Sequence, residues 1–167
     1  MKKILFILCM MFSLMAFAET PLPTDSVYQI NHTFTTQDAR DFKLAERRGK
    51  PQLVAMFYTS CRYICPLIID SAKAVEHSLN TTEQKNISIL LISMDPARDT
   101  PEALMFIAKK RKLDASRWTL ARTDANGVRT VAALLGVRYR ALSDGEFNHT
   151  SALILLDAEG RVLARTE

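Results

Sequence analysis

The sequence predicts an α/β domain in which helices cover both sides of a central β-sheet. Two apolar runs, QLVAMFY at 52–58 and ISILLIS at 87–93, are continuous and rich in strand formers, which is typical of strands buried on both faces. A helical pattern follows each run, and this alternation is typical of α/β domains. Near the end of the sequence, the turn residues DAEG at 157–160 separate two further apolar runs, which indicates a closing β-hairpin.

Three helices are expected between these strands. The first covers about 66–79, since a proline is tolerated in the first turn of a helix, where its missing N–H would have no partner. The second begins at Pro101 with Thr100 as its N-cap. The third covers 128–135 and ends at Gly136.

The remaining segments complete the expected order. Residues 118–121 are predicted to form a short strand, and 152–156 and 161–165 the two strands of the closing hairpin. Residues 19–50 are polar and mixed and are predicted to form an irregular lead-in. No repeat or internal linker interrupts the chain, so we expect one domain over residues 19–167.

The first 18 residues are typical of a signal peptide. Lys2 and Lys3 precede an apolar run at 4–18, and Ala16-Phe17-Ala18 matches the small-x-small cleavage pattern, with the cut expected before Glu19. The apolar run is shorter than the roughly 20 residues of a spanning helix. We therefore expect an exported protein, in a bacterial periplasm, and the alternative is an uncleaved N-terminal segment that anchors the protein to the membrane.

The charge does not indicate a nucleic-acid-binding protein. The net charge is +4 with a pI near 9.1, and the signal segment accounts for two lysines and no acids, so the mature chain carries +2. The densest basic cluster, at 109–112, lies at the expected end of a helix, where cations interact favourably with the helix dipole.

The mature chain keeps two cysteines, Cys61 and Cys65, in the segment TSCRYICPLIID. They lie between a buried strand and the following helix, where the sites of α/β sheets form and where the helix N-terminus favours thiolates. With helix-like geometry, the two Cα atoms would be about 6 Å apart, which permits a disulfide or a shared metal ion. The pair is therefore a redox couple, a set of metal ligands or two buried apolar residues. Cys9 falls inside the signal segment.

Three histidines are candidates for a third ligand. His32 lies in the polar lead-in and His77 on the expected solvent face of a helix, so both are interpreted as surface residues. His149 lies in an expected loop before an edge strand, from which it can reach the cysteines. Two thiolates and one imidazole form a soft ligand set that suits Cu(I) or Zn(II).

Three segments resemble the signature blocks of the Sco/SenC copper proteins: FYTSCRYICP, SMDPARDTPEAL and FNHTSALILLDAEGRVLAR. The resemblance covers about residues 28–167. It implies a thioredoxin-like fold and a role in assembling the binuclear copper site of cytochrome c oxidase. It also implies that Cys61, Cys65 and His149 bind one copper ion and that the two cysteines cycle between dithiol and disulfide.

The expected function is therefore that of a periplasmic copper metallochaperone, with a copper-accepting oxidase subunit as its partner. The alternative is a thiol-disulfide reductase that keeps the cysteines of the oxidase reduced. The C-x-x-x-C spacing argues against the reductase as sole activity, because dedicated oxidoreductases usually use C-x-x-C. A peroxiredoxin-like peroxidase is a third interpretation, but peroxidatic surroundings are not evident. The copper donor and the thiol reductant are not indicated.

Several residues depart from the family pattern. Arg62, Tyr63 and Ile64 stand where an acidic residue is often found between the cysteines, and Asn148 stands where aspartate commonly precedes the histidine. Fewer carboxylates should favour Cu(I) over Cu(II), and Cu(II) is the alternative ion. The usual C-terminal helix is expected to be missing, since the sequence stops at Glu167 after the last predicted strand.

The DPARDTPE segment can have a structural role or a role in orienting the site. Much of it is turn and cap chemistry, since Asp95-Pro96 ends a strand and Thr100-Pro101 starts a helix. Arg98 and Asp99 are expected either to pair within this loop or to orient the cysteine loop. Tyr63 and Phe147 are further candidates to line the site.

Overall fold

The computed structural model describes residues 20–61 and 64–166, so the predicted signal peptide at 1–18 lies outside the described residues. The strands are β1 (Phe34–Thr36), β2 (Asp41–Phe42), β3 (Gln52–Phe57), β4 (Ser88–Ser93), β5 (Trp118–Arg122), β6 (Tyr139–Ala141), β7 (Phe147–His149), β8 (Ile154–Leu156) and β9 (Val162–Arg165). The α-helices are α1 (Ile64–Ser78), α2 (Thr81–Asn86), α3 (Pro101–Lys110) and α4 (Ala125–Leu134), and the short 3₁₀ helices are η1 (Val27–Gln29) and η2 (Leu44–Arg47).

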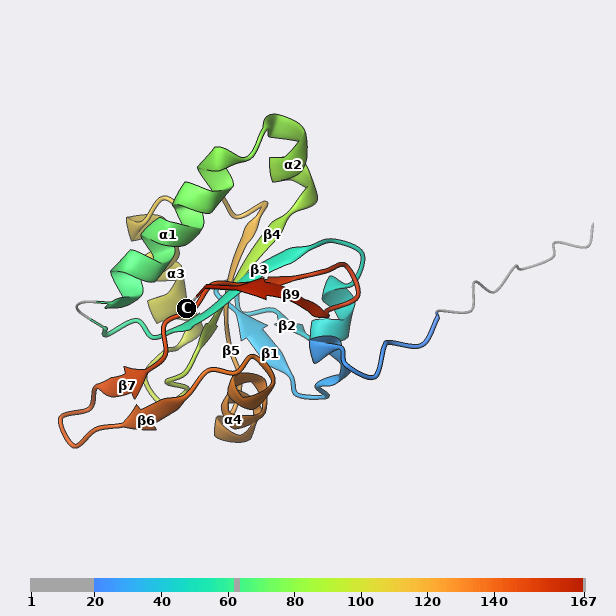
Figure 1. Cartoon of the computed structure of the whole chain (residues 1–167). Coiled ribbons are helices and arrows are strands. Elements are labelled where there is room, and N and C mark those ends of the chain that lie inside the picture. The colour runs from blue at the N-terminus through green and yellow to red at the C-terminus, as the bar shows by residue number, and fades with distance from the viewer. Residues whose placement is uncertain (1–19, 62–63, 167) are drawn as a thin grey trace, which may run out of the picture.

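The predicted central sheet is confirmed. Among the described residues, seven strands form one sheet in the order β2-β1-β5-β4-β3-β8-β9. Strands β3, β4 and β5 run parallel in its middle, and the outer strands pair antiparallel. In Figure 1, α1 and α3 lie on one side of the sheet and α4 lies on the other. Every residue of β3 is buried, as the continuous apolar run predicted.

Helix α1 is fixed to the sheet by a buried carboxylate. Glu76 is 5% exposed and accepts hydrogen bonds from Arg117 Nε at 2.6 Å and from the indole Nε1 of Trp118 at 3.0 Å. Trp118 is the first residue of β5 and Arg117 precedes it, so the far end of α1 cannot shift along the sheet without leaving a buried charge unpaired. The N-terminal end of α1, which carries Cys65, is thereby held in place.

Two hairpins and one helix were not predicted. Strands β1 and β2 form a short hairpin inside the expected lead-in, and α2 fills the segment after α1. Strands β6 and β7 form a separate two-stranded sheet. The expectation that His149 lies in a loop is therefore wrong, because it is the last residue of β7. This hairpin extends away from the main sheet (Figure 1).

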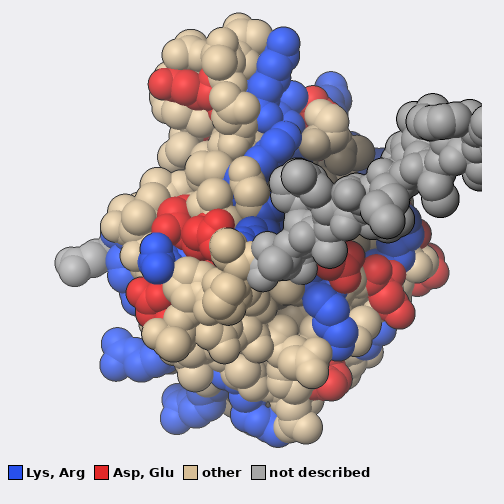
Figure 2. Space-filling view, turned by 90° about the vertical axis from the view of Figure 1, so that its right-hand side faces the viewer, with Lys and Arg blue, Asp and Glu red and all other residues tan. Residues whose placement is uncertain are grey.

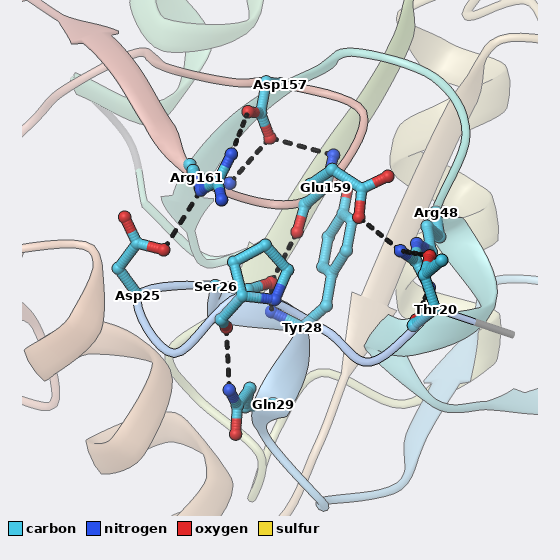
Figure 3. Close-up of polar contacts among 10 residues, drawn as sticks. Thr20, Asp25, Ser26, Tyr28, Gln29, Arg48, Asp157, Glu159 and Arg161 are labelled. Atoms are coloured by element: carbon cyan, nitrogen blue, oxygen red, sulfur yellow. Dashed lines mark hydrogen bonds and ion pairs between the residues drawn. The ribbon is translucent and has the colours of Figure 1, made fainter.

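The segment before β1 and Arg48, which follows η2, both contact the turn between β8 and β9 (Figure 3). Arg48 pairs with Glu159 at 2.6 Å, and Arg161 pairs with Asp25 at 3.1 Å. Gly160, in this turn, has a φ of +82°, and a Cβ built on it would lie 2.6 Å from Tyr28 Cγ. A residue with a side chain would therefore meet both backbone strain and a clash at this position.

On the face shown in Figure 2, basic side chains extend through the upper part, and acidic side chains lie beside and below them. In the described part of the chain, none of the helices is both long and apolar enough to cross a membrane.

Candidate metal site

The two cysteines lie where the carboxyl end of β3 passes into α1. Cys61 is half-buried, and Cys65, in the first turn of α1, is 2% exposed. The backbone N–H of Cys65 points at Cys61 Sγ, with an N···S distance of 3.3 Å. A helix-start N–H, which has no partner within the helix, thus donates to a sulfur that is a candidate ligand.

Burial dominates the acidity of the inner thiol. Removal from solvent raises the pKa of Cys65 far above its ordinary value, although a hydrogen bond from the backbone acts in the opposite direction. The expectation that the helix N-terminus favours a thiolate is therefore wrong for Cys65 in the metal-free protein. A metal cation bound at Cys65 would take the place of the thiol proton and offset the negative charge of the buried sulfur, because metal binding requires deprotonated sulfur.

One nitrogen of the His149 imidazole is available to coordinate a metal ion. Its Nδ1 lies 3.3 Å from the carbonyl oxygen of Thr150, an arrangement that places the proton on Nδ1. Its Nε2 is buried and has no hydrogen-bond partner within the described residues. Burial lowers the pKa of His149, so the ring is held in the neutral form that ligates metals.

The three predicted ligands converge. The ligand atoms of Cys61, Cys65 and His149 all lie within 4.8 Å of one another. The other histidines do not join this group: His32 lies near Asp124, at an N···O distance of 3.8 Å, and His77 is exposed near the end of α1. Among the described residues, no acidic side chain joins the group as a fourth ligand. Three soft donors suit Cu(I), whereas structural zinc sites take four ligands.

Tyr58 connects the β6–β7 hairpin, which carries His149, to the segment after β3, which carries Cys61. Its hydroxyl donates to Glu146 Oε2 at 2.7 Å and accepts from the backbone N–H of Phe147 at 3.4 Å. Its ring packs edge-on against the rings of Phe147 and His149, with centroid distances of 5.1 and 5.8 Å. Burial, and then the hydrogen bond to Glu146, raise the pKa of Tyr58 well above its usual value, so the hydroxyl keeps its proton and donates.

The loop after β4 contacts both halves of the site. The carboxylate of Asp99 is fully buried and accepts from the backbone N–H of Thr59, at 3.1 and 3.2 Å, and from the Thr59 hydroxyl at 2.5 Å. Arg98 pairs with Asp95 and donates to the carbonyl oxygen of Gly145 in the β6–β7 turn. Of the two roles left open for this pair, pairing within the loop is seen for Arg98, through Asp95, and Asp99 instead contacts Thr59 next to the cysteine segment.

Arg98 also lies over the ring of Phe147, with its Cζ 6.0 Å from the ring centroid. Phe147 therefore packs between Tyr58 and Arg98 beside the candidate site. Tyr63 lies outside the described residues. Sequence reasoning missed Tyr58 and Glu146, because the apolar run at 52–58 was interpreted only as a strand.

The comparisons with known proteins agree with this geometry. The family model described as SCO1/SenC matches residues 21–167. The chain is 24% identical over 134 residues to the "SCO1 protein homolog" of Bacillus subtilis (strain 168), covering 78% of this chain and 69% of that protein.

Two solved structures are similar in fold. One is ScoI of Bradyrhizobium japonicum with copper bound, at 23% identity and a TM-score of 0.69, covering 81% of this chain and 87% of that one. The other is BsSco, described as having a disulfide switch and as a member of the Sco family of cytochrome c oxidase assembly proteins, at 23% identity and a TM-score of 0.69, covering 80% and 78%. The fold is therefore the thioredoxin-like fold of these proteins, and, by the match over residues 21–167, the chain belongs to the SCO1/SenC family.

Proposed function

We propose that the protein is a copper metallochaperone that carries one Cu(I) ion on Cys61, Cys65 and His149. The observation that carries this proposal is the convergence of three soft ligand atoms within 4.8 Å of one another. The buried Nε2 of His149, which has no partner in the described structure, supports it, because a buried polar atom without a partner costs free energy unless it binds a ligand. The copper bound by the related ScoI of Bradyrhizobium japonicum gives further support.

The site favours release as well as capture. Cys61 is only half-buried, so an incoming ligand from a partner protein can reach the metal on this side. Three-coordinate Cu(I) leaves room for that ligand, and exchange then proceeds without free copper in solution. The proposed acceptor is an oxidase subunit with a binuclear copper site, in keeping with the description of BsSco as an oxidase assembly protein.

We place this activity in a periplasm, with residues 1–18 as the signal peptide and 19–167 as the copper-binding domain. Membrane contact then arises only through the partner or through an N-terminal segment that is not cleaved. When no metal is bound, the same cysteines form a reversible disulfide. A thiol-disulfide reductase as sole activity explains the cysteines but not the neutral, buried imidazole beside them.

The test is copper binding and transfer under anaerobic conditions. The parent protein is expected to bind one Cu(I), and Cys61→Ser, Cys65→Ser and His149→Ala each to lose it to a competing chelator that the parent resists. His77→Ala is the control, since His77 is exposed and outside the site. Transfer is followed by mixing loaded protein with a purified oxidase copper domain. If His149→Ala retained copper as tightly as His77→Ala, the histidine would have no place in the site.

A further inference from the structure

A cavity of about 110 Å³ opens beside both sulfur atoms, between α1 and α3. For comparison, an apolar cavity of about 150 Å³ binds benzene, so this one accommodates a group of about five heavy atoms. Its walls are largely apolar, and two cations from the end of α3 complete it. The lining includes Cys61, Cys65, Ile69, Ile107, Lys110 and Arg111.

The cavity carries an excess of positive charge. Arg111 donates to the backbone carbonyl oxygen of Pro66 at 3.3 Å and pairs with Asp70, so its charge is largely balanced. Lys110 is exposed, and its Nζ lies 5.8 Å from the centroid of the Phe106 ring. Within the described residues, no carboxylate forms an ion pair with Lys110. Among the described residues that line the cavity, Lys110 is therefore an exposed cation without an ion-pair partner.

The dipole of α3 explains why a cation lies at the C-terminal end of this helix, but it does not explain the cavity beside the two sulfur atoms. We propose that the cavity binds a small thiol carrying a carboxylate, and that this thiol reduces the Cys61–Cys65 disulfide to the copper-binding dithiol. The apolar walls receive its carbon chain, Lys110 attracts its carboxylate, and its sulfur reaches the cysteine pair. This inference rests on the proposed function, since only the dithiol binds copper.

The exchange balances in two steps. The external thiolate attacks Sγ of Cys61, the more exposed cysteine, forming a mixed disulfide, and the electron pair of the broken S–S bond passes to the sulfur of Cys65. A second external thiolate then attacks the external sulfur of the mixed disulfide and releases Cys61 as a thiolate. Two external thiols are thus oxidised to one external disulfide, and one protein disulfide becomes a dithiol.

The test uses three two-carbon thiols that differ in charge: mercaptoacetate (negative), 2-mercaptoethanol (neutral) and cysteamine (positive). Reduction of the oxidised, metal-free protein is followed at low ionic strength for the parent, Lys110→Gln and Lys110→Glu. One charge at about 8 Å in water changes the rate roughly two-fold, and reversal of the charge changes it roughly five-fold. Mercaptoacetate should slow by these factors, 2-mercaptoethanol should not change, and cysteamine should accelerate.

Lys109→Glu is the matched control. Lys109 is the neighbouring residue on α3 but lines a different groove, together with Gln37 and Phe106. The Lys109→Glu variant changes the net charge of the protein by the same amount as Lys110→Glu, and all three thiols should react with this variant at rates close to those of the parent. If Lys109→Glu slowed mercaptoacetate as much as Lys110→Glu, the overall charge of the protein would account for the effect, and the cavity would not bind the thiol.

A second readout does not need a disulfide. The reduced, metal-free protein is alkylated with iodoacetate or with iodoacetamide, which differ mainly in charge, and the ratio of the two rates at Cys61 is measured. Lys110→Glu should lower that ratio by the same roughly five-fold factor. An unchanged ratio would overturn the inference. Copper affinity is measured on the same variants: an unchanged anion preference in Lys110→Glu with intact copper binding removes the inference alone, whereas a parent that binds no copper removes the proposed function.

Discussion

Replacing Tyr58 with phenylalanine should weaken copper binding, although the substitution replaces none of the three proposed ligands. The substitution keeps the ring that packs on Phe147 and His149 but removes the hydroxyl that donates to Glu146 and accepts from the backbone of Phe147. These contacts hold the hairpin that carries His149 against the loop that carries Cys61. The effect is therefore predicted to be on the position of the imidazole.

The magnitude follows from the two hydrogen bonds. The short bond to the carboxylate of Glu146 is partly solvated, and the bond from Phe147 is long, so together they stabilise the docked hairpin by about 1 to 2 kcal/mol. If the hairpin of the variant is docked for only part of the time, the apparent affinity falls in proportion to the docked fraction. A loss of about 1.4 kcal/mol corresponds to a fall of at most about ten-fold, and we expect about three- to ten-fold.

The assay is competition for Cu(I) with a chromophoric chelator, together with amide hydrogen exchange of residues 139–149 in the metal-free protein. Tyr139→Phe is the control, since Tyr139 lies in the same hairpin and its hydroxyl makes no hydrogen bond in the described structure. We expect faster exchange and weaker binding only for Tyr58→Phe. Equal affinities for the two variants, with unchanged hydrogen exchange, would refute the clamping role of Tyr58.

Three further outcomes are expected. Burial raises the pKa of Asp99 above its ordinary 3.8, so its ionisation opposes folding as pH rises; the stability advantage of the parent over Asp99→Asn should therefore be larger at pH 4 than at pH 7 in urea unfolding. Gly160→Ala should lower the free energy of unfolding more than Gly49→Ala, since both glycines have a positive φ but only a Cβ on Gly160 meets Tyr28. The difference between the two losses of unfolding free energy should be about 1 to 3 kcal/mol, and equal losses would contradict the predicted clash. Asn148→Asp adds a charge at an exposed position, worth about 0.5 kcal/mol at about 8 Å in water, so the copper reduction potential should fall by about 20 mV, and a rise would count against electrostatic tuning by this residue.

The buried part of the fold was predictable because its pattern is local. Strands β3 and β4 were predicted within a residue or two, since continuous apolar runs leave few alternatives. The N-cap of α3 by Thr100 and its start at Pro101 are also confirmed. Helix α2 carried a signal that was not used: Asn80 and Glu83 form a capping box, which is visible in the sequence as N-x-x-E.

The two hairpins were harder to predict because their strands are short and polar. The turn between β6 and β7 contains Asp144-Gly145, a dipeptide typical of hairpins, which would have placed His149 in a strand. The turn between β1 and β2 offers no such signal, since Ala39 adopts a positive φ of 56° there. These hairpins depend on contacts with distant residues, such as that of Phe147 with Tyr58, which a local pattern does not contain.

The candidate ligands were chosen from residue type and resemblance, and the structure brings their ligand atoms together; that they bind copper stays a prediction. The acidity of Cys65 was predicted with the wrong sign. The helix N-terminus was visible in the sequence, but the burial that outweighs it comes from packing of side chains from several elements. The contacts of Arg98 and Asp99 were left open for the same reason.

X-ray absorption at the copper edge tests the central claim most directly. The Cu(I)-loaded parent is compared with loaded His149→Ala and with the control His77→Ala. Our prediction is two sulfur neighbours and one imidazole nitrogen in the parent and in His77→Ala, and loss of the imidazole contribution in His149→Ala. A spectrum with only sulfur neighbours in the parent, or an imidazole contribution that persists in His149→Ala, would contradict it.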